Sequence, residues 1–245
     1  PYAAPPVGEA RFAPPGPVPP WEGERPALGW PAPCPQLSSA TGEILGSEDC
    51  LALNVWRPEA AEGAPVLVFI HGGGNVFGST SELNSGVHIY SGARLARRFG
   101  VVVVTLQYRL DILGYLADPA LGALDGGAAA NWGLRDQIAA LRWVQRNVAA
   151  FGGDPDRVLL SGQSGGAASV CGLVASPAAA GLFSAAIMQS GGCGGRWLAE
   201  VRAWGDEVAA AVGCADAADR SGLPARRGRR RAGAGGQRGA GAVRG

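Results

Sequence analysis

Residues 157–168, RVLLSGQSGGAA, restrict the fold of this chain more than any other stretch. Residues 158–160 are apolar and predict a short buried strand, and the small residues of 167–174 predict a helix soon after it. The two are joined by the pattern G-x-S-x-G, with Ser164 at its centre. So sharp a turn strains the serine backbone and leaves no room for Cβ atoms on either side, which explains the flanking glycines. The stretch therefore predicts that Ser164 is presented above a sheet, at the N-terminus of a helix.

Other strands and helices alternate along the chain. Strands are predicted at residues 51–56, 66–70, 101–106 and 185–189, and helices at 91–99 and 134–148. The continuous apolar run 66–70 is typical of a central strand covered on both faces, and Ser91 is expected to cap the first of the two helices. The alternation favours the α/β class, with a mostly parallel, doubly wound sheet.

The N-terminal residues 1–37 are rich in proline and leave two interpretations open. A flexible linker has such a composition. The aromatic side chains of Phe12, Trp21 and Trp30 favour instead a segment pinned on the core.

Charge divides the chain near residue 220. All 21 basic residues are arginines, and residues 220–245 contain eight of them and no acid. The other 13 arginines and all 20 acids lie in residues 1–219, which carry a net charge of −7. We therefore expect a folded domain over 1–219 and a disordered tail over 220–245, because the tail has no hydrophobic period.

The tail also has the composition of GC-rich DNA translated in a shifted frame. We hypothesise a fragment that is incomplete at its N-terminus and frameshifted near residue 220, which resequencing of the locus tests. Arginine-rich segments also bind RNA. No aromatic residue lies among these arginines and the body of the chain is acidic, so no nucleic-acid partner is predicted.

The five cysteines are too few for a disulfide scaffold, and their spacing matches no zinc motif. Cys34 and Cys50 are close enough in sequence to close a short loop, but unpaired buried thiols fit the composition equally well. Apolar runs such as 101–104 are far too short to span a membrane.

A second motif, His71-Gly72-Gly73-Gly74, follows the strand predicted at 66–70. Acyl transfer builds negative charge on a carbonyl oxygen, and backbone N–H groups held in a water-poor pocket stabilise that charge. A glycine run lets the backbone approach the oxygen closely. Together with G-x-S-x-G, each motif after an apolar strand, this order predicts a serine hydrolase.

The chain resembles the type B carboxylesterases, the family of carboxylesterases, cholinesterases and related lipases. The resemblance rests on PYAAPPVGEARF, CPQ, EDCLALNVWRP, HGGG, NWGLRDQIAALRWVQRNVAAFGGDP, the stretch around Ser164 and IMQSGG. It extends from residue 1 to about residue 213, and EDCLALNVW separates this family from the hormone-sensitive-lipase-like esterases, which share HGGG. The resemblance implies the α/β-hydrolase fold, of which this chain holds the N-terminal portion.

The resemblance also implies a role for each motif. Ser164 would be the nucleophile at a nucleophile elbow, and Gly73, Gly74 and Gly165 would form the oxyanion hole. An acyl-enzyme on Ser164 would need neither a metal nor a cofactor. The substrates would be small-molecule carboxylic esters.

Other residues follow from the same resemblance. Cys34 would pair with Cys50, a bridge that favours export over a cytoplasmic location. Ser190 and Gln163 would lie beside the catalytic triad. Members of the family usually have Glu and Ala where this chain has Gln163 and Gly165, so a preference for cationic esters is not expected.

The remaining triad residues are not found in this sequence. In this fold the acid and the histidine follow the serine, but His71 and His88 both precede Ser164. His71 belongs to the glycine loop, and His88 is expected on the surface or in a loop. The acids after Ser164 lie in or beside a predicted helix, and none is assigned to the triad: Glu200, Asp206, Glu207, Asp216 and Asp219.

The sequence therefore predicts a carboxylic-ester hydrolase that is inactive as this chain alone, because a serine is a poor nucleophile without a base. The alternative is a non-catalytic cholinesterase-like binding or adhesion domain. Such domains typically lose the nucleophile, whereas Ser164 is present. The sequence predicts no oligomeric state.

Overall fold

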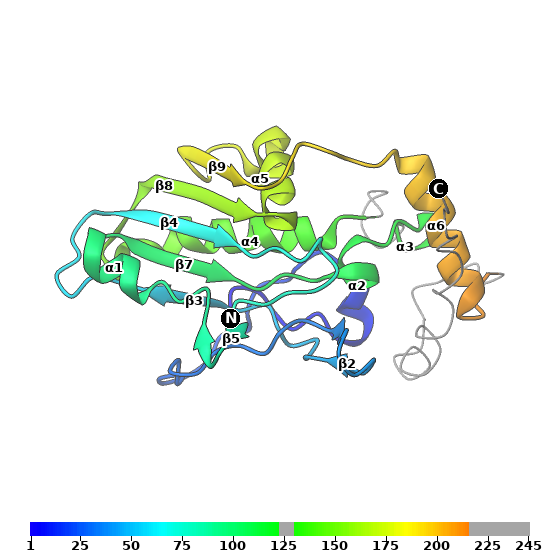
Figure 1. Cartoon of the computed structure of the whole chain (residues 1–245), viewed down its shortest axis with the longest axis horizontal. Helices are drawn as coiled ribbons and strands as arrows, with labels where there is room; N and C mark the ends of the chain where they lie inside the picture. The colour runs from blue at the N-terminus through cyan, green and yellow to red at the C-terminus, as the bar shows by residue number, and fades with distance from the viewer. Residues whose placement is uncertain (123–129, 216–245) are drawn as a thin grey trace, which may run out of the picture.

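A five-stranded sheet forms the centre of the molecule in the computed structural model, which describes residues 1–122 and 130–215 (Figure 1). Its strands lie in the order β3 (Leu53–Trp56), β7 (Val102–Leu106), β4 (Ala64–Ile70), β8 (Gly153–Gln163) and β9 (Ala185–Gln189). β3 is antiparallel to β7, and the other four strands are parallel to one another. Ile70 pairs with Leu106 on one side and with Gly162 on the other, so the carboxyl ends of these strands meet at one edge.

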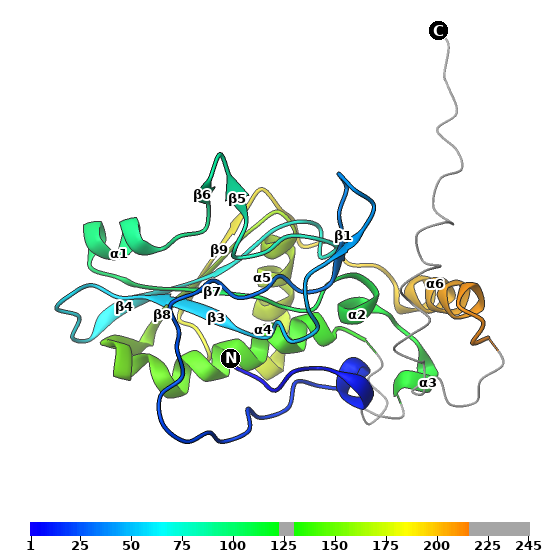
Figure 2. The ribbon, with the colours of Figure 1, turned by 90° about the horizontal axis from the view of Figure 1, so that it is seen from below.

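Helices cover both faces of this sheet, as the doubly wound prediction requires. Figure 2 shows α1 (Ala93–Phe99) and α4 (Trp132–Asn147) on opposite faces. α5 (Gly165–Ala175) packs against β8, β9 and α4, and α6 (Leu198–Ala211) lies at the end of the molecule opposite α1 (Figure 1). The shorter elements are η1 (Gly8–Phe12), β1 (Gln36–Leu37), β2 (Ile44–Leu45), β5 (Leu83–Asn84), β6 (Val87–His88), α2 (Asp111–Tyr115), α3 (Pro119–Gly122), η3 (Val148–Phe151) and η4 (Pro177–Ala179).

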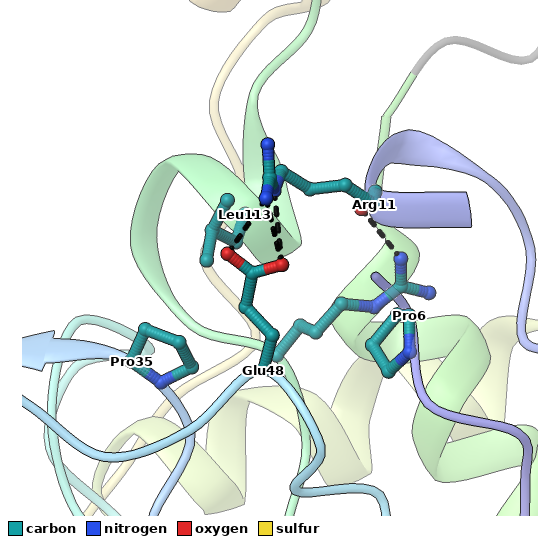
Figure 3. A pocket seen from close by; sticks show the side chains of 6 residues that line it. Pro6, Arg11, Pro35, Glu48 and Leu113 are labelled. Carbon is teal, nitrogen blue, oxygen red and sulfur yellow. Dashed lines mark hydrogen bonds and ion pairs between the residues drawn. The ribbon is translucent and has the colours of Figure 1, made fainter. Parts of the chain in front are cut away.

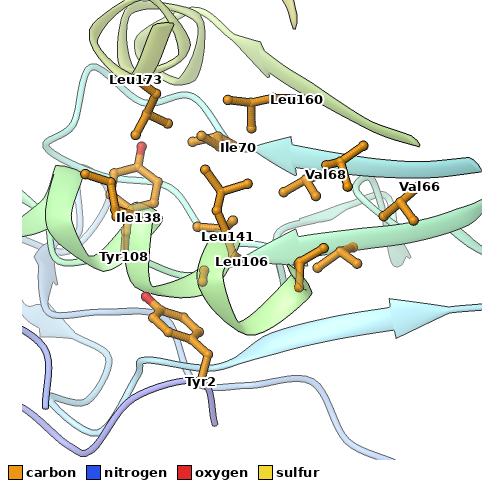
Figure 4. Packing of buried hydrophobic residues seen from close by; sticks show 14 of the residues in the cluster. Tyr2, Val66, Val68, Ile70, Leu106, Tyr108, Ile138, Leu141, Leu160 and Leu173 are labelled. Carbon is orange, nitrogen blue, oxygen red and sulfur yellow. The ribbon is translucent and has the colours of Figure 1, made fainter. Parts of the chain in front are cut away.

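The core lies between the sheet and α4 (Figure 4). One face of this helix is apolar and points inward, since Leu141 and Val144 are fully buried. They pack in one cluster with the buried β-branched and leucine side chains of the sheet: Val66, Val68, Ile70, Val102, Val104, Leu106, Val158 and Leu160. Each fully buried aliphatic side chain of this kind stabilises the fold by about 1.5–3 kcal/mol.

Several predicted boundaries were wrong by a few residues. The strand predicted at 158–160 begins at Gly153, because backbone pairing with β4 continues through residues that carry no apolar signal. The strand predicted at 66–70 buries alternate side chains fully and the others only partly. Ser91 does not cap α1, because Gly92 occupies the N-cap position. A Cβ at Gly92 would lie 2.6 Å from the Cβ of Val103, so only glycine fits there.

The N-terminal segment is pinned on the core and is not a free linker. Phe12 is buried against Trp132, Trp30 packs on Trp56, and Trp21 remains exposed. Figure 3 shows the guanidinium of Arg11 against the carboxylate of Glu48, with the shortest N–O distance 2.9 Å.

Cys34 and Cys50 form a disulfide, which closes the loop that carries β1 and β2. The pairing implied by the resemblance is therefore confirmed, and the alternative of unpaired thiols was wrong at these positions. In residues 1–122 and 130–215, no helix is long and apolar enough to cross a membrane. The same residues contain no cluster of three or more His, Cys, Asp or Glu side chains that could hold a metal ion.

Candidate functional site

Ser164 lies at the turn between the end of β8 and the start of α5. Its φ of 55° and ψ of −119° are uncommon for a residue with a side chain, and such a conformation costs of order 1–3 kcal/mol and persists only where its surroundings hold it. The Ser164 N–H donates to the carbonyl of Gln189 at 2.8 Å, and its own carbonyl accepts the N–H of Ala168 at 3.1 Å. These two bonds hold the strained backbone from the side of β9 and from the first turn of α5.

The glycines of G-x-S-x-G are explained by close packing. A Cβ at Gly162 would overlap the carbonyl oxygen of Gly166, and a Cβ at Gly166 would overlap the carbonyl oxygen of Ile70. Three segments therefore meet beside Ser164 with only backbone between them: the end of β4, the end of β8 and the start of α5.

The substitution Gly166→Ala is expected to lower the free energy of unfolding by about 2–3 kcal/mol, because α5 must move away from β4 to admit the methyl group. The matched control is Gly172→Ala in the same helix, where the nearest atoms would be the Leu134 methyl carbons at 3.6 and 3.7 Å. That control should be neutral or stabilising by up to about 1 kcal/mol, through helix propensity. Urea unfolding followed by circular dichroism measures both, and equal effects of the two substitutions would contradict the packing argument.

The glycine loop after β4 lies against this turn. Gly73 and Gly74 have φ values of 99° and 62°, which favour glycine. A Cβ at Gly165 would lie 2.7 Å from the amide nitrogen of Gly74, and a Cβ at Gly72 would lie 3.2 Å from the Cβ of Ser164. The structure thus brings the loop, the first residue of α5 and Ser164 into direct contact.

A chain of hydrogen bonds through Asn75 holds the glycine loop in place. The side-chain oxygen of Asn75, which has a φ of 62°, accepts from the hydroxyl of Tyr108 at 3.3 Å and from that of Ser169 at 3.4 Å. Gln137 on α4 donates to the Ser169 hydroxyl at 3.2 Å, and the Asn75 carbonyl accepts the N–H of Asp111 at 2.7 Å. The loop is therefore fixed in register with α5, α4 and the segment after β7.

His71 lies at the start of the glycine loop and packs against Tyr108, one of these hydrogen-bonding residues. Its ring stacks on Tyr108 with centroids 4.5 Å apart, and Nδ1 donates to the Gly72 carbonyl at 2.9 Å. Burial lowers the pKa of His71 to about 4, because the charged imidazolium loses its solvation, although the bond to Gly72 opposes the shift. His71 is therefore neutral at pH 7, and its hydrogen bond to Gly72 stabilises the glycine loop.

His88 is half-buried on β6, where its ring stacks on Trp30 with centroids 4.0 Å apart. His88 is thus held by its contact with Trp30 and is only partly exposed. Within the described part of the chain, neither histidine hydrogen-bonds to Ser164.

Gln163 and Ser190 both lie next to the turn at Ser164. A Cβ at Gly72 would lie 2.8 Å from the Oε1 atom of Gln163, so this neutral side chain borders the glycine loop. Ser190 follows β9 with a φ of 53° and is exposed, and the residues before and after it touch the backbone of Ser164.

Three of the downstream acids lie on α6, as expected: Glu200, Asp206 and Glu207. This helix packs through Val208 on the cluster around Leu116 and Trp132, away from α5 (Figure 1). Asp216, Asp219 and the predicted tail 220–245 lie outside the described residues.

The sequence motifs did not predict two parts of this site. The hydrogen-bonded support of Asn75 joins residues up to 94 positions apart, and its sequence signal is limited to polar residues at the ends of apolar runs. A second disulfide, Cys171–Cys193, joins α5 to the segment after β9. The cysteine in each partner segment was a signal for it, but pairing could not be inferred without the fold.

Comparisons with known proteins agree with this geometry. Human cocaine esterase is 46% identical over 206 residues, and p-nitrobenzyl esterase of Bacillus subtilis is 45% identical over 197 residues. These matches cover 78% of this chain but only 35% and 39% of the two relatives, so the chain spans little more than a third of their length.

Solved structures show the same relation. A carboxylesterase of Geobacillus stearothermophilus superposes with a TM-score of 0.81 at 39% identity, over 93% of this chain and 47% of that one. A p-nitrobenzyl esterase superposes with a TM-score of 0.78 at 42% identity, over 87% and 43% of the two chains. The predicted α/β-hydrolase fold is confirmed by these neighbours. The family model described as the carboxylesterase family matches residues 1–225. The chain belongs to the carboxylesterase family.

Proposed function

We propose that this chain carries the nucleophile and the oxyanion hole of a carboxylic-ester hydrolase that works through an acyl-enzyme on Ser164. The observation that supports this most directly is the contact between Gly165 and the Gly74 amide, beside a serine held at a φ of 55°. A strained serine at a helix N-terminus, next to a glycine loop, is the arrangement in which α/β-hydrolases place their nucleophile and oxyanion hole. The names of the relatives, which are esterases, point to the same reaction.

In the proposed reaction the Ser164 hydroxyl attacks the carbonyl carbon of an ester. Negative charge develops on the carbonyl oxygen, and the N–H groups of Gly73, Gly74 and Gly165 stabilise it. Each such donor contributes about 3 kcal/mol to the stabilisation of the transition state. The alcohol then leaves, and water releases the acid from the acyl-enzyme. No cofactor or metal takes part.

The general base comes from outside this chain in our proposal. His71 is buried, neutral and bonded to Gly72, and His88 is stacked on Trp30. A histidine that accepts the Ser164 proton would lie in the part of the relatives that this chain does not span. The substrates are small-molecule carboxylic esters, and the neutral Gln163 beside the glycine loop gives no charge that would select cationic ones.

The intact elbow favours this hydrolase over a non-catalytic binding domain, because a binding domain has no need of a strained serine. The proposal is tested with a chimera in which residues 1–213 replace the matched segment of Bacillus subtilis p-nitrobenzyl esterase. The chimera is expected to hydrolyse p-nitrophenyl butyrate. A chimera that is folded by circular dichroism but inactive would contradict the proposed function.

The chain alone should show no turnover of p-nitrophenyl butyrate above that of its Ser164→Ala variant, because no base activates the hydroxyl. The release of p-nitrophenolate, followed by absorbance at equal protein concentrations, measures this difference. Turnover by the chain that disappears in Ser164→Ala would show that a base is present after all.

A further inference from the structure

The disulfide Cys171–Cys193 lies close to the elbow. Cys171 is on α5, seven residues after Ser164, and Cys193 is in the exposed segment that follows β9. The two Cα atoms are 5.4 Å apart, so the bond holds this segment directly against the helix that begins at Ser164.

The segment that the disulfide holds also touches the backbone of Ser164. The carbonyl of Gln189 accepts the Ser164 N–H at 2.8 Å. A Cβ at Gly191 would lie 2.5 Å from the Ser164 carbonyl oxygen and 2.7 Å from the Cβ of Ala167. Residues 189–193 therefore form one wall of the elbow, hydrogen-bonded to Ser164 at one end and covalently tied to α5 at the other.

Backbone pairing with β8 and packing against α5 hold the strand that leads into this wall. β9 lies at the edge of the sheet, all five of its residues are exposed, and among the described residues only β8 pairs with it. A covalent tie at its end therefore restricts the motion that would release Gln189 from Ser164.

We propose that the Cys171–Cys193 disulfide is a clamp that fixes the backbone of Ser164 by holding residues 189–193 against α5. Both cysteines are positioning residues in this view, because they act on Ser164 through Gln189 and Gly191. The clamp concerns the backbone of the elbow, and it rests on the proposed function only for its catalytic consequence.

The clamp is also open to reduction. Cys193 is exposed and Cys171 half-buried, whereas Cys34 and Cys50 are each 1% exposed. A dithiol reductant attacks one sulfur of the exposed bridge and displaces the other as a thiolate. The second thiol of the reductant then releases the mixed disulfide, so that both cysteines are reduced and the dithiol is oxidised to a disulfide.

Hydrogen–deuterium exchange of the full chain tests the clamp, with Cys171→Ser/Cys193→Ser as the test variant and Cys214→Ser as the matched control. Cys214 is a free thiol outside both bridges. In the test variant, peptides covering 160–168 should exchange on the order of tenfold faster, as expected for a released local segment. Peptides covering β7 should keep their rates, as should every peptide of the control.

Unchanged exchange at 160–168 would overturn the proposal, and so would an equal rise at β7, since that is a general loss of stability. Mild treatment of the unmodified chain with dithiothreitol gives the second measurement, independent of any substitution. Alkylation should appear at Cys171 and Cys193 before Cys34 and Cys50, together with the faster exchange at 160–168. Alkylation of the buried bridge first would contradict the clamp's accessibility. None of these readouts uses ester hydrolysis, so they stand apart from a failure of the proposed function.

Discussion

Replacing Ser164 by alanine in the chimera described above is expected to lower kcat for p-nitrophenyl butyrate by about 10⁴-fold or more. The substitution removes the proposed nucleophile, so no acyl-enzyme would form. The glycine loop, with Gly73 and Gly74 beside Gly165, remains in place and, as the proposed oxyanion hole, would still stabilise developing charge on the carbonyl oxygen. A residual rate above that of the uncatalysed reaction is therefore compatible with the prediction.

The matched control for this substitution is Ser176→Ala. Ser176 ends the helix that Ser164 begins, and its backbone N–H bonds to the carbonyl of Leu173 without use of its hydroxyl. The control should keep kcat within about twofold, since surface substitutions of this kind change little. A burst of p-nitrophenolate in the unmodified chimera and its absence in Ser164→Ala would identify the acyl-enzyme. Retention of turnover in Ser164→Ala would contradict a role of this serine as nucleophile.

The substitution Asp136→Asn is expected to lower the free energy of unfolding by about 3–5 kcal/mol, because it leaves a buried arginine without its counter-charge. Asp136 on α4 is 0% exposed, and Arg109 after β7 is 2% exposed. Arg109 donates to the two carboxylate oxygens at 2.8 and 2.7 Å, and its backbone N–H donates at 3.1 Å. The same guanidinium also binds the carbonyls of Arg11 and Ala13, which join the N-terminal segment to the core.

Burial raises the pKa of the Asp136 carboxyl, and the hydrogen bonds and charge of Arg109 act in the opposite direction. Each charge of the pair is therefore stabilised by the other, and removal of either one leaves a buried charge without its partner. A loss of this size is a large part of the 5–15 kcal/mol that stabilises a typical domain. The midpoint of urea unfolding measures it directly.

Glu48→Gln is the matched control, because it breaks the pair with Arg11, whose side chain is 13% exposed while that of Glu48 is 30% exposed. A partly solvated pair contributes about 1 kcal/mol or less. Equal losses in Asp136→Asn and Glu48→Gln would show that burial does not set the cost. A second variant, Arg109→Met/Asp136→Leu, should recover part of the stability, since an apolar pair leaves no buried charge.

The strands of the sheet were predicted well where a run of mostly apolar residues marks them. The run 185–189 coincides with β9, and 101–106 contains β7. Prediction was poorer where backbone pairing or close packing decides, because these forces leave no apolar pattern. β8 extends back to Gly153, and Gly92 takes the capping position of α1 from Ser91.

The candidate site also contains some residues that the sequence could predict and others that it could not. Ser164 and the glycine loop could be predicted because sharp turns demand particular residues within a few positions of one another. The bond between Asn75 and Ser169 and the bridge between Cys171 and Cys193 join segments that only the fold brings together. Their residue types are common in proteins, so no short motif marks them.

At position 164, the serine that the proposed reaction needs is less stable than a glycine would be. Glycine would adopt the φ of 55° without steric cost, whereas serine there costs of order 1 kcal/mol or more. Gly162 and Gly166, in contrast, are required by packing whatever reaction takes place beside them. A relative released from selection for catalysis would therefore be free to drift to glycine at position 164 while it keeps both flanking glycines. The flanking glycines therefore indicate that the fold has been inherited. The residue between them indicates whether the activity of the protein is still under selection.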